Sequence, residues 1–115
     1  EIWGTGSAYH EFLHVDDLAD ACLFLMDNYS DIEHINVGTG EDGSIASLAE
    51  RIRDLVHPQA SISFDTSKPD GMPRKVLDIS KIKDLGWEPQ ISLTEGLTAT
   101  YAWYLNALEE GEARL

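Results

Sequence analysis

The chain has 115 residues, 43% of them hydrophobic, which is enough for one globular domain. Acidic residues outnumber basic residues by 21 to 8, and the net charge of −13 disfavours nucleic acid and anionic membrane surfaces as partners. The single cysteine excludes a disulfide framework and a multi-cysteine metal site. The sequence shows neither an apolar run of ~18 residues nor a signal-peptide pattern, so we expect a cytoplasmic protein.

Residues 11–29 change their hydrophobic period from that of a strand to that of a helix. A strand is expected over 12–15. Apolar residues then recur with the spacing of a helix face at Leu18, Ala21, Cys22 and Leu25. Asp16 and Asp17 stand at the join, where a carboxylate can cap the helix and interact with its dipole. The pattern predicts a helix that ends near residue 29, with Cys22 as a buried thiol.

A glycine motif follows a second short strand, which is expected over 34–37. Residues 38–43 have the G-x-G-x-x-G spacing of a dinucleotide-binding loop, and Asp65 lies about twenty residues further on. Against that function, Glu41 and Asp42 would stand where a pyrophosphate must approach, and the chain has too few strands for a doubly wound sheet. We expect a tight turn followed by Ser44 as a helix cap. A miniature dinucleotide binder is the alternative.

The rest of the pattern predicts two more long helices and a short one. An amphipathic helix runs over 45–56, and residues 62–65 form a short strand. A short helix begins at Ser80 as its cap and is ended by Gly86. The capping box at 92–95 opens the last helix, whose tyrosine and tryptophan rings we expect to be buried. The acidic tail, residues 109–115, is expected to fray.

Basic residues gather late in this acidic chain. Five of the eight lie at Lys68, Arg74, Lys75, Lys81 and Lys83. Two prolines and a Pro-Asp-Gly turn stiffen the loop over 66–75, so its cations are partly preorganised for a small anion. The cluster is either such a site or a solvated face. Asp70 either closes the turn through its side chain or accepts a hydroxyl group of a sugar.

The first loop, residues 3–10, carries an aromatic residue near each end and two glycines between them. Trp3 either packs in a core or stacks on a planar ligand. The four histidines lack the spacing of zinc ligands, and no Ser/His/Asp group can be argued from their order. From the residues alone we therefore predict no catalytic, cofactor-binding or metal site within the chain.

Four motifs, in order, resemble the GDP-L-fucose synthase family: residues 3–6, 11–21, 34–40 and 64–75. The resemblance implies an extended short-chain dehydrogenase that converts GDP-4-keto-6-deoxy-D-mannose to GDP-L-fucose by 3,5-epimerisation and NADPH-dependent 4-keto reduction. In that family the Rossmann domain, with its NADP(H) loop and Ser/Tyr/Lys triad, precedes the matched motifs. Residues 1–115 would then be the C-terminal substrate-binding domain of a longer enzyme and inactive alone.

The fold implied is a small mixed α/β domain with three to four short strands and three main helices, without a Rossmann domain. The family's substrate contacts, carried over by motif, fall on Trp3, Asp70 and Lys75. We expect Lys75, with help from Arg74 or Lys68, to neutralise the diphosphate while Trp3 and Asp70 position the sugar end. His10 stands where the family usually has an arginine, so an imidazole replaces a bidentate clamp.

The resemblance also implies three partners: a GDP-sugar substrate, the N-terminal Rossmann domain of the same enzyme, and a second copy in a homodimer. Two alternatives are a domain of a related nucleotide-sugar epimerase or dehydratase and a stand-alone binding module without catalysis.

Overall fold

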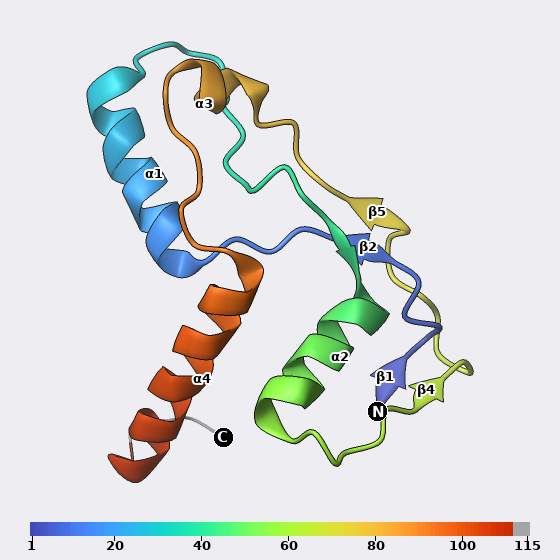
Figure 1. Ribbon diagram of the computed structural model, residues 1–115. Coiled ribbons are helices and arrows are strands. Elements are labelled where there is room, and N and C mark those ends of the chain that lie inside the picture. The colour runs from blue at the N-terminus through green and yellow to red at the C-terminus, as the bar shows by residue number, and fades with distance from the viewer. Residues whose placement is uncertain (112–115) are drawn as a thin grey trace.

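The computed structural model describes residues 1–111 and has four helices and short strands (Figure 1). In chain order the elements are β1 (Ile2–Trp3), β2 (Tyr9–His10), α1 (Val15–Asn28), β3 (Gly43–Ser44), α2 (Ile45–Val56), β4 (Phe64–Asp65), β5 (Arg74–Lys75), α3 (Ser80–Asp84) and α4 (Leu93–Glu109). The mixed α/β class and the three main helices, α1, α2 and α4, are confirmed.

The strands form two small sheets. β1 and β4 are parallel, with Trp3 opposite Asp65, and the second sheet has the order β3-β2-β5. Within the second sheet, β2 is antiparallel to β3 and parallel to β5, so that His10 lies opposite Lys75. The chain passes directly from β3 into α2, and α3 lies at the end of α1 that is remote from α2 (Figure 1).

The described part of the molecule is flat and extended. Its radius of gyration is 16.9 Å and its extents are 47 × 37 × 21 Å, whereas a compact domain of this length has a radius of about 13 Å. The buried core joins α1 to α3 through Ala21, Ile79, Ile82 and Trp87. No helix among the described residues is long and apolar enough to cross a membrane.

Two of the expected strands are absent from residues 1–111. Residues 12–14 lead into α1 without sheet pairing, and residues 34–37 form no strand and have no strand paired with them. An alternating apolar pattern gives a strand only where a second segment completes the hydrogen-bonded ladder. The expected strand over 62–65 is present at its last two residues as β4.

The caps of two helices differ from the prediction. His14 caps α1 because its Nδ1 accepts the backbone N–H of Asp16 at 3.2 Å, so the two aspartates lie inside the first turn. Ser80 is the first residue of α3 and not its cap, and its N–H donates to the Asp78 carboxylate at 2.9 Å. The caps expected at Ser44 and Ser92 are confirmed, the latter as a complete capping box.

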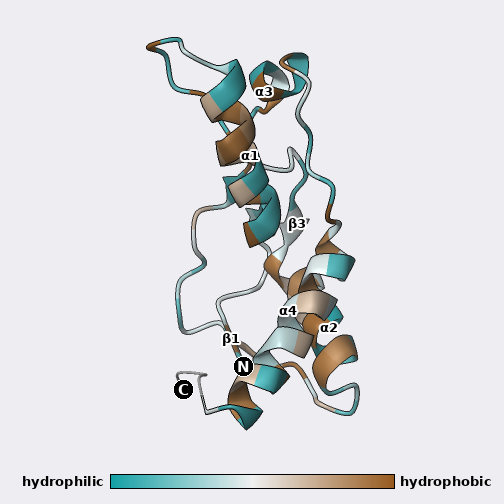
Figure 2. Ribbon diagram, turned by 90° about the vertical axis from the view of Figure 1, so that its left-hand side faces the viewer, coloured by the Kyte–Doolittle hydropathy of each residue, from teal (hydrophilic) through white to brown (hydrophobic). Residues whose placement is uncertain are grey.

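Two burial predictions are wrong. Cys22 is exposed, because α1 is covered on the side of Ala21 and Leu25 only. On α4, Tyr101 and Tyr104 are half-buried and Trp103 is 66% exposed. Hydrophobic segments are visible along α1 and α2 in Figure 2. The tail is expected to fray from residue 109, and Glu109 is the last residue of α4. The last residues of the tail, 112–115, lie outside the described part of the chain.

Candidate functional site

The expected substrate residues lie along two chain segments that run side by side. Residues 2–11 and 63–77, here called the paired ribbon, are joined through both parallel strand pairs (Figure 1). Between and beyond the strands, Gly4 N–H donates to the Asp65 carbonyl at 2.9 Å and Tyr9 N–H donates to the Pro73 carbonyl at 2.9 Å. Parallel pairing thus brings together two stretches that are more than sixty residues apart in sequence, and the two form one surface.

The first end of the paired ribbon holds Trp3, Lys68 and Asp70. The Lys68 ammonium lies 5.6 Å from the centre of the Trp3 ring, which is 69% exposed. This is the distance of a cation–π contact. Trp3 therefore does not pack in the core, and most of its side chain is exposed to solvent beside the Lys68 ammonium.

Asp70 fastens its loop to the first loop of the chain. Its carboxylate accepts the Thr5 backbone N–H at 2.7 Å and the Thr5 hydroxyl at 2.8 Å. These bonds hold the pKa of Asp70 below its ordinary value. Gly4 has a positive φ of 80°, and a Cβ there would overlap this carboxylate. Both carboxylate oxygens of Asp70 thus accept hydrogen bonds from Thr5, and neither closes the turn that contains Asp70.

The second end of the paired ribbon brings His10 beside Lys75. The two residues are opposite each other in the parallel pair, and the Nε2 atom of His10 lies 3.3 Å from the carbonyl oxygen of Met72. Lys75 is exposed. An imidazole and an ammonium on adjacent strands make this end of the ribbon the place where an anionic group would be favoured.

Arg74 has a partner within the protein. Its Nε donates to the Asp42 carboxylate at 2.6 Å, and this hydrogen bond and the charge of Asp42 raise the pKa of Arg74. The side chain of Asp42 is only 12% exposed. A guanidinium held in this way fixes β5 to the glycine turn and has less of its charge free for a ligand.

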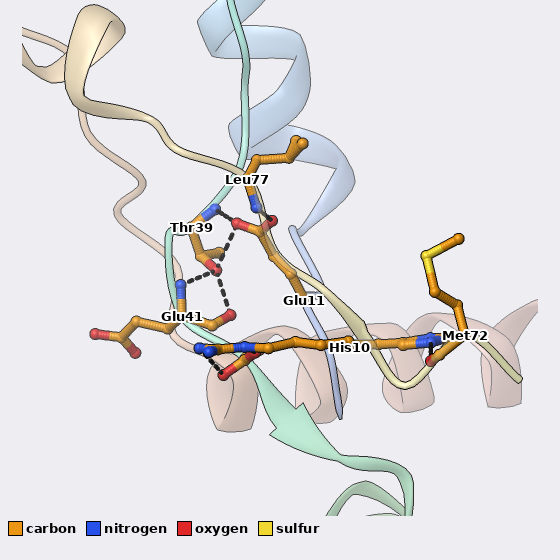
Figure 3. Close-up of polar contacts among 8 residues, drawn as sticks. His10, Glu11, Thr39, Glu41, Met72 and Leu77 are labelled. Atoms are coloured by element: carbon orange, nitrogen blue, oxygen red, sulfur yellow. Dashed lines mark hydrogen bonds and ion pairs between the residues drawn. The ribbon is translucent and has the colours of Figure 1, made fainter. Parts of the chain in front are cut away.

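A further cluster centres on Glu11, which the sequence did not single out. Its Oε1 accepts the Thr39 N–H at 2.5 Å and its Oε2 accepts the Leu77 N–H at 2.9 Å (Figure 3). Oε1 also accepts the Gly40 N–H at 2.6 Å. A Cβ at Gly38 would overlap the same carboxylate. An acidic residue before an apolar run gives no local signal of partners twenty-eight or more residues away.

The Glu11 cluster decides how the G-x-G-x-x-G motif is used. In a dinucleotide-binding loop the backbone N–H groups of the motif face a pyrophosphate. Here two of those N–H groups already bind an internal carboxylate, and Asp42 of the motif binds Arg74. The residues present therefore do not fit a dinucleotide, and the motif forms a turn.

One cavity of about 560 Å³ opens between the glycine turn, α2 and the segment before α4. Residues of both charge signs line it, among them Glu41, Arg51, Lys83 and Glu88, and His10 lies at its edge. Of the expected substrate contacts it includes His10 but not Trp3, Asp70, Arg74 or Lys75, so the cavity adjoins the paired ribbon only at its second end. Within residues 1–111 no group of three His, Cys, Asp or Glu side chains is placed to hold a metal ion.

Comparison with known proteins identifies the class of enzyme to which this chain is related. Residues 1–38 match the NAD dependent epimerase/dehydratase family. The chain is a homologue of GDP-L-fucose synthases: it is 56% identical over 104 residues to the probable GDP-L-fucose synthase 1 of Oryza sativa subsp. japonica, a match that covers 90% of this chain and 32% of that protein. The chain thus spans about a third of the length of the curated relatives it matches.

The fold is shared with solved structures of such enzymes. A GDP-L-fucose synthetase from Naegleria fowleri bound to NADP superposes with a TM-score of 0.87 at 29% identity, over 96% of this chain and 36% of that chain. A UDP-glucose 4-epimerase from Thermotoga maritima, in a structure with UDP-glucose, gives a TM-score of 0.83 at 29% identity, over 94% of this chain and 36% of that chain. The flat, extended shape is therefore that of one portion of a larger fold.

Proposed function

We propose that residues 1–115 form the substrate-binding domain of an enzyme that converts GDP-4-keto-6-deoxy-D-mannose to GDP-L-fucose. The domain corresponds to the C-terminal part of that enzyme. Epimerisation and the NADPH-dependent reduction are carried out with residues and NADP(H) held by an N-terminal Rossmann domain, and the fragment alone is inactive. The similarity to GDP-L-fucose synthases over 90% of the chain supports this assignment.

One observation carries the substrate-binding role. The residues expected to contact the substrate were drawn from sequence positions 3 to 75, yet the paired ribbon gathers all of them along one pair of hydrogen-bonded segments. The members are Trp3, His10, Asp70, Arg74 and Lys75. Motifs that belonged to unrelated loops would have no reason to pair in register.

The two ends of the paired ribbon bind different parts of the ligand. Lys75 neutralises negative charge on the diphosphate of the GDP-sugar, and the imidazole of His10 on the adjacent strand hydrogen-bonds to the same group. Trp3 supplies an exposed ring at the other end, beside Lys68. Arg74 binds Asp42 and Asp70 binds Thr5, and these contacts hold the surface together. Both residues therefore affect the ligand by fixing the shape of the surface.

The test is binding of GDP by the protein and by its Lys75→Ala variant. A lost charge-assisted bond is worth about 1.5–3 kcal/mol, so Kd for GDP should rise by about tenfold or more. In the complete enzyme KM for the GDP-sugar should rise by the same factor while kcat is unchanged. Lys81→Ala is the matched control: Lys81 pairs with Glu33 on α3's side of the molecule, and its loss removes the same charge. Equal affinities of Lys75→Ala and the unaltered protein would contradict the site.

UDP is an alternative candidate nucleotide, because the fold is shared with an epimerase whose structure holds UDP-glucose. Thermal shifts with GDP, UDP and NADPH separate the candidates, since only a ligand that binds the folded state raises the midpoint. Stabilisation by GDP alone supports the proposed substrate. Stabilisation by UDP indicates a related nucleotide-sugar enzyme, and stabilisation by NADPH alone indicates that the glycine turn binds a dinucleotide after all.

The full enzyme is expected to act as a homodimer in the cytoplasm. Size-exclusion chromatography with light scattering on the longer protein would test the dimer. A monomer that retains full activity would contradict it.

A further inference from the structure

The structure joins three separate segments through the single carboxylate of Glu11. The Glu11 cluster, defined as Glu11, Thr39, Gly40 and Leu77, links β2 to the glycine turn and to the chain just after β5. Figure 3 shows the contacts of Glu11 with Thr39 and Leu77. The Thr39 hydroxyl adds a bond to the same carboxylate at 3.2 Å. The side chain is partly buried, so these bonds replace water that the ionised group would otherwise bind.

The position of Glu11 ties this cluster to the expected diphosphate site. Glu11 directly follows His10, and its own N–H donates to the carbonyl of Lys75 at 3.2 Å. Leu77 follows Lys75 by two residues. The carboxylate therefore closes a short ring, formed by Glu11 and residues 75–77, directly after the His10–Lys75 pair. If this ring opened, β2 and β5 would keep their two-residue ladder, the Tyr9–Pro73 and Glu11–Lys75 backbone bonds and the His10–Met72 contact, but would lose the link to the glycine turn through Glu11.

We propose that Glu11 is the positioning residue of the diphosphate site: its carboxylate uses the Gly38–Gly43 turn as an anchor and holds His10 and Lys75 in register for the ligand. This inference rests on the proposed function, because the affected ligand is GDP. It gives the glycine motif a role that its spacing alone did not indicate, since the N–H groups bind a carboxylate of the protein instead of a phosphate. Glu11 acts through its neighbours and does not touch the ligand.

Electrostatics alone predicts the opposite change in affinity for GDP from the change that a positioning role predicts, so the direction of the change decides between the two. Removing a negative charge near an anion site should tighten binding of GDP by Coulomb's law. Positioning requires the reverse, because Glu11→Gln replaces an acceptor oxygen by an NH₂ donor that faces N–H groups. We expect Kd for GDP to rise by about tenfold in Glu11→Gln.

Two controls and a second variant lie in the same turn. Glu41→Gln removes the same charge from an exposed side chain and should leave Kd within about twofold. Gly38→Ala keeps the carboxylate but crowds it, and should weaken GDP binding as Glu11→Gln does. Gly43→Ala is its match, because a Cβ at Gly43 meets no atom within 4 Å. If Glu11→Gln does not fold, comparing GDP binding by Gly38→Ala and Gly43→Ala still tests the proposal.

Kinetics distinguishes positioning from a general folding defect. In the complete enzyme, Glu11→Gln should raise KM for the GDP-sugar about tenfold and leave kcat unchanged, because it weakens binding without touching the reacting atoms. A merely destabilised protein instead loses active enzyme, which lowers kcat at constant KM. Amide exchange at Thr39, Gly40 and Leu77 should also become faster in this variant.

Each outcome has a defined meaning. Faster exchange at these three amides with an unchanged Kd for GDP would overturn the positioning role and leave the proposed function intact. Tighter binding by Glu11→Gln would also overturn it, in favour of simple charge repulsion. Absence of GDP binding by the unaltered protein would overturn the proposed function, and the positioning role with it.

Discussion

Asp17 on α1 accepts the backbone N–H of Ile91 at 2.9 Å, although the two residues are seventy-four positions apart. Its other oxygen accepts the Gln90 N–H at 3.1 Å, and the residue is only 4% exposed. The neighbouring Asp20 accepts the indole N–H of Trp87 at 2.8 Å. Two carboxylates of α1 thus hold the segment that leads into α4, in a molecule whose apolar core is small.

Asp17→Asn should lower the free energy of unfolding. An amide cannot accept both N–H groups with both of its heavy atoms, so one buried donor is left unpaired at a cost of about 1–3 kcal/mol. Urea titration at neutral pH measures the change. Asp27→Asn, at an exposed position near the end of the same helix, should shift the free energy by less than about 0.5 kcal/mol. Equal effects of the two substitutions would contradict the anchoring role.

The attachment of Asp70 to Thr5 should fail in acid. Because the folded-state pKa of Asp70 is lowered, its ionised form is favoured by folding; the stabilisation is present above the ordinary aspartate pKa of about 3.9 and is lost as the pH falls through the lower folded value. The amide signal of Thr5 should titrate in that acid range. Asp70→Asn should abolish the titration. A Thr5 signal that remains constant down to complete unfolding would show that the bond does not form.

His10→Arg should tighten binding of GDP if the diphosphate lies at the His10–Lys75 pair. A permanently charged, bidentate guanidinium replaces an imidazole, and one additional charge-assisted bond corresponds to about tenfold in Kd. Calorimetric titration with GDP measures the change. His57→Arg, at the exposed C-cap of α2, introduces the same charge remote from β2 and should have little effect. Equal gains from both substitutions would point to net charge alone.

An apolar stripe on α1 should bind hydrophobic probes. Val15, Leu18, Cys22 and Met26 follow one helix face, and Val15 and Met26 are 68% and 79% exposed. We expect Met26→Lys to reduce binding of an apolar dye and self-association with a change in unfolding free energy below about 0.5 kcal/mol. Ile32→Lys, at an exposed apolar residue outside the helix, should reduce dye binding much less. No dye binding by the unaltered chain would favour a stand-alone module.

The sequence was sufficient where the determinants are local. Helix α2 begins and ends where its apolar period and flanking residues predict, and Ser92 and Glu95 form the expected capping box, because caps and helix faces depend on residues three or four positions apart. The motifs that resemble GDP-L-fucose synthases also identified the relatives correctly, since an ordered series of motifs is carried by the chain itself.

Tertiary structure decided what depends on distant partners. The strand expected over 34–37 has no neighbour within the described residues, and β2, β3 and β5 exist only because segments up to sixty-five residues apart meet. Cys22 is exposed because only part of the apolar arc of α1 is covered. Likewise, Glu11 and Asp42 gained their roles from Leu77 and Arg74, residues that no local pattern connects to them. Spacing along the chain specifies helices and turns, but ladder pairing and internal ion pairs require knowing which segments are adjacent in space.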